Sequence, residues 1–226
     1  MSKSDDDSFI KIKQQLDKVS SSFCLAKWKQ VTLHLQNGTT HSCHHPAAHA
    51  IDKSQLPTNP SALHNTDFKK LTRKQMKNGQ RPQECNYCWD IEDQQGMHIS
   101  DRYIKSGDKS FINDSDIETI SKLDWDANIN PSYVEVSFSN TCNLKCAYCS
   151  PVHSSKWHQE IKQDGAYPLF GKRELHSLER LEKVRQTPMH SNELNPYTQA
   201  FWSWWPSLIK SLKVLRKTKS RQKCDT

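Results

Sequence analysis

Three closely spaced cysteines constrain this chain more than any other feature of its sequence. They are Cys142, Cys146 and Cys149, in the segment Cys-Asn-Leu-Lys-Cys-Ala-Tyr-Cys. With eight cysteines in 226 residues, this C-x3-C-x2-C spacing would arise by chance in roughly one chain in a hundred. Three soft thiolates on one loop can each bind one iron of a cubane cluster, which leaves the fourth iron open to a cofactor. Zinc would need a fourth protein ligand, for example His153.

Four cysteines nearer the N-terminus form a second candidate set: Cys24, Cys43, Cys85 and Cys88. Alternating apolar and polar residues at 31–36, then Asn37-Gly38 and a return segment at 39–43, predict a β-hairpin, because both central residues of a type I′ turn need a positive φ. Two of the cysteines lie toward its open end, and the other two form a C-x2-C knuckle. Four thiols suit an iron–sulfur cluster or zinc, and unliganded buried thiols are the remaining alternative.

Histidines crowd around one of these cysteines, at His41, His44, His45 and His49. Because the four cysteines already complete a ligand set, we expect a solvated histidine-rich loop. The alternatives are that a histidine supplies a ligand, or donates a hydrogen bond that raises the potential of a cluster.

Composition favours a metal-dependent fold in a reducing compartment. Only 34% of the residues are hydrophobic and the mean hydropathy is −0.87. No run of about 20 apolar residues could form a transmembrane helix, and the opening residues lack the apolar stretch of a secretory signal. We therefore expect a soluble, cytoplasmic protein whose cysteines are reduced and bind metal rather than form disulfides. A bound metal is expected to supply part of the folding free energy of so polar a chain.

The positive charge is concentrated at the C-terminal end. The net charge is +7, and residues 213–226 alone carry six basic residues and one acidic residue. This distribution indicates a basic tail rather than a basic domain face, so neither a nucleic-acid partner nor a membrane partner is expected.

Further elements are predicted from periodicity, caps and turn residues. A helix at 67–77 carries Phe68, Leu71 and Gln75 on one face, and Ser115 with Glu118 forms a capping box for another helix. The aromatic segment 201–205 is expected to be core, with a substrate pocket or partner surface as the alternative. The other predictions are a helix at 9–19, a connector at 54–66, a strand at 133–138, a crossover helix at 153–163, an irregular segment at 165–196, a helix at 197–212 and a strand-like segment at Val214-Leu215.

The three-cysteine loop after a predicted strand resembles the signature of the radical S-adenosylmethionine (radical SAM) enzymes. The resemblance implies a [4Fe–4S] cluster on Cys142, Cys146 and Cys149, with S-adenosylmethionine bound at the open iron and Tyr148 packed against its adenine. It implies reductive cleavage of that cofactor to a 5′-deoxyadenosyl radical that abstracts hydrogen from a peptide or small-molecule substrate. Flavodoxin or ferredoxin is the implied electron donor. The implied fold is a partial (β/α)6 barrel with the cluster loop after its first strand.

The N-terminal cysteines resemble the twitch and SPASM modules, which carry auxiliary iron–sulfur clusters. The likeness is greatest to a radical SAM group of marine bacteria and phages in which such a module comes first. It rests on Phe23-Cys24, on 33–38, on the segment from Ser42 to Pro46 and on Glu84 to Trp89. The expected organisation is mixed α/β: an α+β cysteine-rich module at 1–128, the first part of the barrel at 129–216, and a basic tail at 217–226 that is not native to the fold.

The chain departs from that family after the cysteine loop. Only 77 residues follow Cys149, whereas six strand–helix units need roughly 200. The family's GGE motif, expected directly after 213–216, is absent there. We therefore expect a C-terminally truncated chain that is inactive alone, with Cys224 incidental. The alternatives are a zinc- or cluster-binding module that partners a separate barrel, and a zinc-stabilised structural or nucleic-acid adaptor. The sequence does not identify a substrate.

Overall fold

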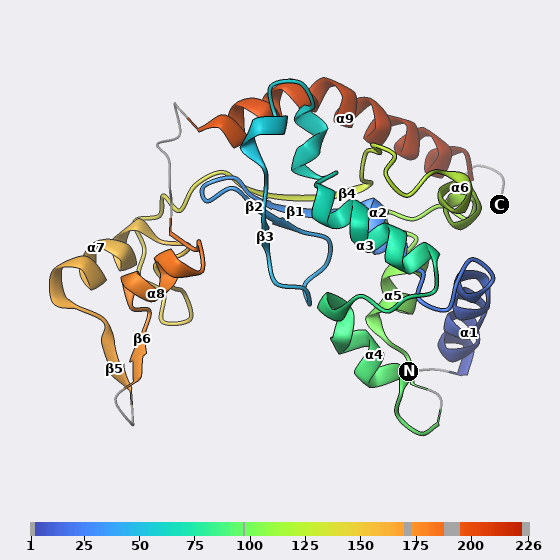
Figure 1. The fold of residues 1–226 in the computed structure, drawn as a ribbon, viewed down its shortest axis with the longest axis horizontal. Helices are drawn as coiled ribbons and strands as arrows, with labels where there is room; N and C mark the ends of the chain where they lie inside the picture. Colours follow the sequence, from blue (N-terminus) through green and yellow to red (C-terminus); the bar gives the residue numbers. More distant parts are fainter. Residues whose placement is uncertain (1–2, 97, 170–172, 188–194, 223–226) are drawn as a thin grey trace.

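The computed structural model describes residues 3–96, 98–169, 173–187 and 195–222, so Cys224 lies outside the described residues (Figure 1). These ranges form a mixed α/β fold. The helices are α1 (Lys3–Asp17), α2 (Ala26–Lys29), α3 (Asp67–Lys77), α4 (Asn86–Glu92), α5 (Asp101–Gly107), α6 (Asp116–Lys122), α7 (Ser155–Asp164), α8 (Leu178–Lys183) and α9 (Pro196–Gln222), with 3-10 turns η1 (Lys53–Gln55), η2 (Pro60–Leu63) and η3 (Gln83–Cys85). The strands are β1 (Gln30–His34), β2 (Thr39–His41), β3 (His49–Ala50), β4 (Tyr133–Ser137), β5 (Tyr167–Leu169) and β6 (Arg173–Leu175).

The central sheet has the strand order β3-β2-β1-β4. The predicted hairpin is confirmed: β1 and β2 pair antiparallel, with Thr32 opposite His41, and Gly38 at the turn has a φ of +66°. The predicted strand at 133–138 is also confirmed, as β4, which pairs parallel with β1. Within the described residues these four strands form an open sheet and no barrel. The sheet thereby joins a strand from beyond residue 128 to the N-terminal hairpin.

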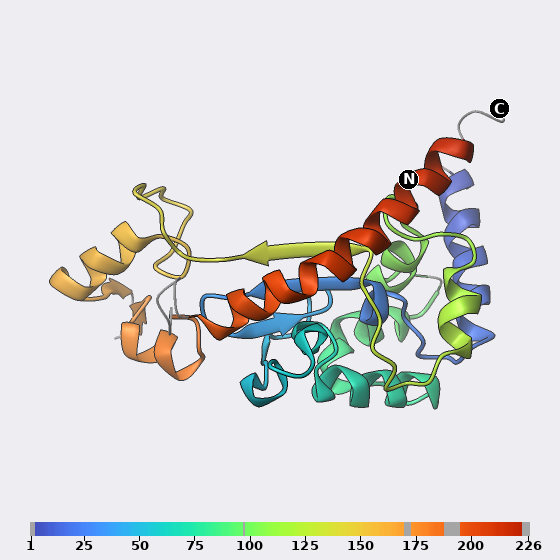
Figure 2. The same ribbon diagram turned by 90° about the horizontal axis from the view of Figure 1, so that it is seen from above.

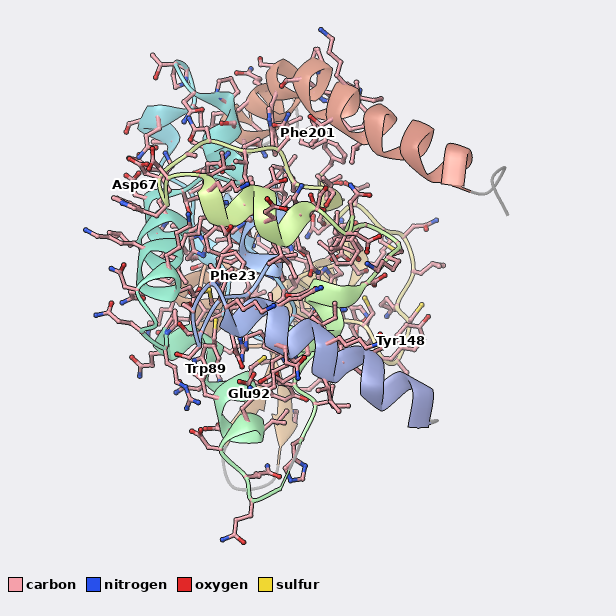
Figure 3. The ribbon with its side chains drawn as sticks, turned by 90° about the vertical axis from the view of Figure 1, so that its right-hand side faces the viewer. Phe23, Asp67, Trp89, Glu92, Tyr148 and Phe201 are labelled. Atoms are coloured by element: carbon pink, nitrogen blue, oxygen red, sulfur yellow. The ribbon has the colours of Figure 1, made fainter. Side chains whose placement is uncertain are left out.

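Helix α9 covers one face of this sheet (Figure 2). Val31 and Leu33 of β1 and Val136 of β4 pack against its apolar side, as expected for strands that alternate between two faces. The prediction that the aromatic segment is core is confirmed for Phe201 and Trp204, which are buried. A second apolar cluster lies under α1, α4, α5 and α6, where Phe23 is central (Figure 3).

Four local predictions need correction. The strand-like segment at Val214-Leu215 is wrong, because the α9 backbone continues to Gln222, in a stretch that lacks glycine or proline to end a helix. The capping box is wrong, since Ser115 makes no side-chain cap and Glu118 instead bonds Lys122. The segment at 165–196 is not simply irregular, because the hairpin of β5 and β6 and helix α8 lie within it.

The fourth correction concerns the expected crossover helix. Helix α7 forms close to the predicted residues, but it lies beyond the end of the sheet together with β5, β6 and α8. The helix that covers β4 is α9 (Figures 1 and 2).

Among the described residues, no helix combines the length and apolar content needed to cross a membrane.

Helix α3 has the predicted bounds, but the face that carries Phe68 and Leu71 points outward. Phe68 is 46% exposed and Leu71 57%. The buried face carries Lys69, Arg73 and Met76 instead. Arg73 can be buried because it donates hydrogen bonds to the carbonyl of Lys27 and to the side chain of Asn65, which solvate its charge inside the protein.

Candidate metal centre

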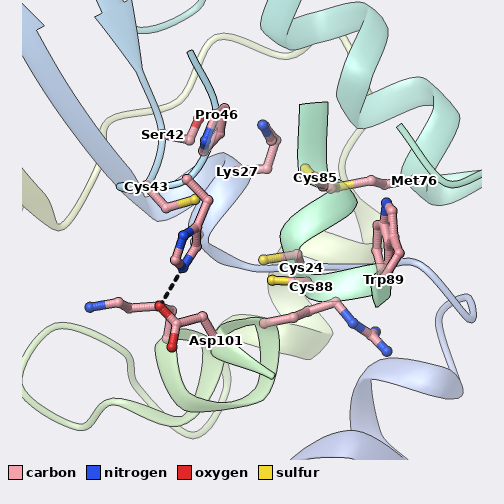
Figure 4. Close-up of a pocket in the computed structure, with 14 residues that line it drawn as sticks. Cys24, Lys27, Ser42, Cys43, Pro46, Met76, Cys85, Cys88, Trp89 and Asp101 are labelled. Atoms are coloured by element: carbon pink, nitrogen blue, oxygen red, sulfur yellow. Dashed lines mark hydrogen bonds and ion pairs between the residues drawn. The ribbon is translucent and has the colours of Figure 1, made fainter. Parts of the chain in front are cut away.

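The four N-terminal cysteines line one pocket, although they lie on segments far apart in the sequence (Figure 4). Cys24 lies just before α2, Cys43 follows β2, Cys85 ends η3 and Cys88 lies in the first turn of α4. The antiparallel hairpin brings the first two together, because its register places Cys43 level with Gln30, at the start of β1. The knuckle is fixed by Trp89, whose indole Nε1 donates to the carbonyl of Pro82 at 2.9 Å.

The thiols of this pocket are close enough for the charge on each to act on the others. Burial raises the pKa of Cys85 and of Cys88 to about 12, and it also raises the pKa of Cys43. The free thiols of Cys43, Cys85 and Cys88 are therefore protonated at neutral pH, and metal binding would have to release their protons. As the side chains are placed in the described ranges, no group of three or more Cys, His, Asp or Glu is arranged to hold a metal ion.

Two buried cations line the pocket of the four thiols. Lys27 and Arg102 line the pocket, with exposures of 3% and 2%. Lys27 forms an ion pair with Glu84, and Arg102 pairs with Glu92 at 2.7 Å. Burial disfavours the charge on Lys27, but the neighbouring Cys85 and Glu84 together raise its pKa above the ordinary value.

Two further buried cations, Lys69 and Arg73, lie behind the pocket without a carboxylate partner in the described part of the chain. Both contact His64: the Lys69 amino group lies 3.0 Å from its Nδ1, and the Arg73 guanidinium lies 3.2 Å from its Nε2. Burial lowers the pKa of Lys69 well below its usual range and that of Arg73 to about 9. Burial therefore disfavours the charged form of both groups, and a negative charge at Cys43 would favour the charged form of Lys69.

A buried hydroxyl in the same pocket also lacks a partner. Ser42 lines the pocket and is 2% exposed, and its Oγ makes no hydrogen bond within the described residues. A buried hydroxyl usually finds a partner, so this donor would suit a thiolate or sulfide in the pocket.

Of the four histidines predicted near Cys43, the structure brings only His45 to the wall of this pocket. His45 is held by Asp101 at 2.8 Å and stacks on the Tyr87 ring at 3.6 Å. His41 instead contacts His34 at 3.2 Å, and His49 contacts Thr66 at 2.9 Å, while His44 does not line the pocket. The loop is therefore ordered by its own contacts rather than being simply solvated.

The second cysteine set occupies one loop beyond the C-terminal end of β4. Cys142, Cys146 and Cys149 are each half-buried. The N-terminus of α7 holds the loop, because Ser155 donates from Oγ to the Cys142 carbonyl at 2.9 Å and Trp157 donates from Nε1 to the Cys146 carbonyl at 3.1 Å.

Tyr148, the residue expected to contact adenine, projects from that loop. It is 94% exposed, and a hydrogen bond between its hydroxyl and Cys146 raises the pKa of Tyr148. The two cysteine sets lie at opposite ends of the parallel strands β1 and β4. The five residues of β1 separate them by at least about 13 Å along the strand direction.

Sequence reasoning missed the charged and polar neighbours of the thiols: Lys27, Ser42, Lys69 and Arg102. Lysine and arginine are seldom fully buried, so no residue pattern predicts a buried position for them. Proximity in sequence to Cys24 and Cys43 was the one signal for Lys27 and Ser42. Comparison of the chain with protein-family models, curated proteins and solved structures found no match.

Proposed function

We propose that this chain is an iron–sulfur protein of the radical SAM type, with an auxiliary metal–thiolate centre on Cys24, Cys43, Cys85 and Cys88. The observation that carries the proposal is the convergence of these four thiols, from three separate segments, on one pocket lined by buried cations. Four thiolates around zinc or around an oxidised [4Fe–4S] core form a dianionic centre. The charge of Lys69, which interacts with Cys43, would then have compensating negative charge close by.

The residues present fit such a centre in two further respects. The donors are soft sulfur ligands, which iron–sulfur clusters and zinc prefer. Ser42, whose Oγ has no hydrogen-bond partner in the described residues, also lines this pocket, and outer-shell donors orient metal ligands and tune their basicity.

We propose that Cys142, Cys146 and Cys149 hold the second, catalytic [4Fe–4S] cluster. When bound with S-adenosylmethionine, this cluster would supply the electron that cleaves the cofactor to a 5′-deoxyadenosyl radical. The protein's part is to hold the loop at the end of β4 through Ser155 and Trp157 and to leave Tyr148 exposed for contact with adenine. In this proposal β4 is the first strand of a partial (β/α)6 barrel and the protein acts in the cytoplasm.

A second candidate function is a zinc-binding or cluster-binding partner module without catalysis. It is favoured by the chemistry of the N-terminal set, since the same four thiolates complete a tetrahedral zinc site. The three-cysteine loop would then be a structural segment. The metal that the purified chain retains separates the two functions.

The test is anaerobic purification and reconstitution of the full chain, followed by iron, sulfide and zinc analysis. Replacing Cys142, Cys146 and Cys149 together by Ala should remove about one cubane and leave the other. Replacing Cys85 and Cys88 by Ser should remove the other one and make residues 81–107 sensitive to protease. Cys224→Ala, a cysteine in neither set, is the control and should retain all metal.

Three results would contradict parts of this proposal. Zinc without iron or sulfide would favour the non-catalytic module. Equal loss of all iron in both cysteine variants would exclude two separable clusters. Unchanged protease resistance of the Cys85 and Cys88 variant would show that apolar contacts alone hold the knuckle. Production of 5′-deoxyadenosine from S-adenosylmethionine after reduction with dithionite, lost in the Cys142 loop variant, would support the catalytic role.

A further inference from the structure

Helix α2 directs two lysines to two different surroundings. Lys27 lines the four-thiol pocket and pairs with Glu84. Lys29, two residues later, points to α6 and pairs with Asp116 at 2.8 Å. Both lysines are largely buried and both have a carboxylate partner, so they differ chiefly in their distance from the thiols.

The ammonium group of Lys27 lies between the Cys43 and Cys85 sides of the pocket (Figure 4). Its charge acts on both of these thiols, whereas the carboxylate of Glu84 acts on Cys85 from the neighbouring position in the chain. The two members of this ion pair therefore impose opposite potentials on the same pocket. Because both are shielded from water, their effects are screened much less than those of surface charges.

We propose that Lys27 is the charge-compensating residue of the N-terminal metal–thiolate centre: its buried ammonium group stabilises the four-thiolate form and favours one-electron reduction. This inference rests on the proposed function. Reduction adds one electron, supplied in the experiment by dithionite, and makes a dianionic four-thiolate cluster trianionic without breaking a bond. A fixed positive charge beside the cluster favours the more negative state, and net charge is one of the factors that set the potentials of such clusters.

Glu84 supplies the matching opposite prediction. Neutralising its carboxylate removes a negative charge from beside Cys85 and should make reduction easier. If Lys27 and Glu84 served only to hold η3 against α2, loss of either would loosen the pocket in the same way. An electrostatic role instead predicts that loss of Lys27 and loss of Glu84 shift the midpoint potential of the cluster in opposite directions.

The test measures the midpoint potential of the N-terminal cluster in full-length protein. The protein also carries Cys142→Ala, Cys146→Ala and Cys149→Ala, so that the measured potential is that of the N-terminal cluster alone. Lys27→Met should decrease the ratio of reduced to oxidised cluster at a fixed potential by on the order of tenfold. Glu84→Gln should increase that ratio, and Lys27→Arg should keep it close to that of the parent. Lys29→Met, which removes a buried charge from the same helix, is the matched control and should leave it unchanged.

A shift in Lys27→Met no larger than that in Lys29→Met, or shifts of one sign in Lys27→Met and Glu84→Gln, would overturn the inference while leaving the proposed function intact. If Lys27→Met does not assemble a cluster, the direction of the shift in Glu84→Gln decides: a lower ratio of reduced to oxidised cluster in that protein would overturn the inference. A parent protein that binds neither iron nor sulfide would overturn the proposed function and this inference together.

Discussion

Arg102 anchors the knuckle of Cys85 and Cys88, and its replacement is the strongest stability test that the structure offers. Its guanidinium donates to both carboxylate oxygens of Glu92, at 2.9 and 2.7 Å, and to the carbonyl of Phe23 at 3.0 Å. It also lies 5.5 Å from the Trp89 ring centre and 4.6 Å from that of Tyr103. These contacts attach α4, which carries Cys88, to α5 and to the segment before α2.

The expected loss follows from burial. The side chains of Arg102 and Glu92 are 2% and 7% exposed, so Arg102→Met leaves a buried carboxylate without its partner. Removal of one partner from a buried ion pair costs about 3–5 kcal/mol of unfolding free energy. With a urea dependence of about 2–3 kcal/mol per molar, the unfolding midpoint should decrease by about 1–2.5 M.

Arg81 provides a matched control on the same tryptophan. It lies 5.3 Å from the Trp89 ring centre and makes two hydrogen bonds of 2.7 Å to Asp93. The side chains of this pair are 44% and 60% exposed, and exposed pairs contribute about 0–1 kcal/mol. Urea titrations followed by tryptophan fluorescence should therefore separate Arg102→Met from Arg81→Met by at least about 2 kcal/mol.

Equal and small losses in both variants would refute the argument that burial makes the Arg102 pair important. A second check is the double variant Arg102→Met with Glu92→Met, which removes both charges and retains apolar volume. It should recover most of the stability lost in Arg102→Met, because replacement of a whole buried pair by apolar residues is often neutral.

Three further predictions concern the sheet and its surroundings. Phe201→Ala should lower the unfolding free energy by about 3–5 kcal/mol in urea titrations, whereas Trp202→Ala, at a position 54% exposed, should cost less than about 1 kcal/mol. Gly38→Ala should lower the melting temperature measured by circular dichroism, because φ there is +66° and the new Cβ would lie 2.2 Å from Cζ of Tyr197. Burial lowers the pKa of His49 from 6.5 to about 3. Between about pH 3 and pH 6.5 the unfolded chain therefore binds a proton at His49 that the folded chain does not. Stability should therefore fall as the pH decreases below about 6.5, and His49→Gln should reduce the slope by up to about 1.4 kcal/mol per pH unit, measured by urea titration at several pH values.

Elements with strong local signals were predictable from the sequence. Asn37-Gly38 between alternating segments predicts the hairpin because the turn itself requires these residues. Helix α3 begins after Thr66, whose side chain accepts from the Lys69 amide, and ends at Asn78-Gly79, so both of its ends have local causes. The convergence of Cys24 and Cys43 follows from the same hairpin.

Features that depend on distant partners were not predictable. The buried face of α3 carries Lys69 and Arg73, and hydrophobic periodicity assigns such residues to the surface. They are accommodated inside because His64, Asn65 and backbone carbonyls satisfy their donors. The parallel pairing of β1 with β4 joins residues about a hundred positions apart, and no local pattern specifies the partner of a strand.

That parallel pairing links the two cysteine sites physically. In the described residues β4 pairs only with β1, and Leu35 continues the pairing by donating from its amide to the Ser137 carbonyl at 2.9 Å. The chain between the two strands forms the module that carries Cys43, Cys85 and Cys88. A parallel pair always needs such a crossover, and here the crossover carries three of the four cysteines of one candidate metal centre, while the strand that it returns to leads into the other cysteine set. The strand that leads into the Cys142 loop is therefore held by pairing with β1 of the N-terminal module.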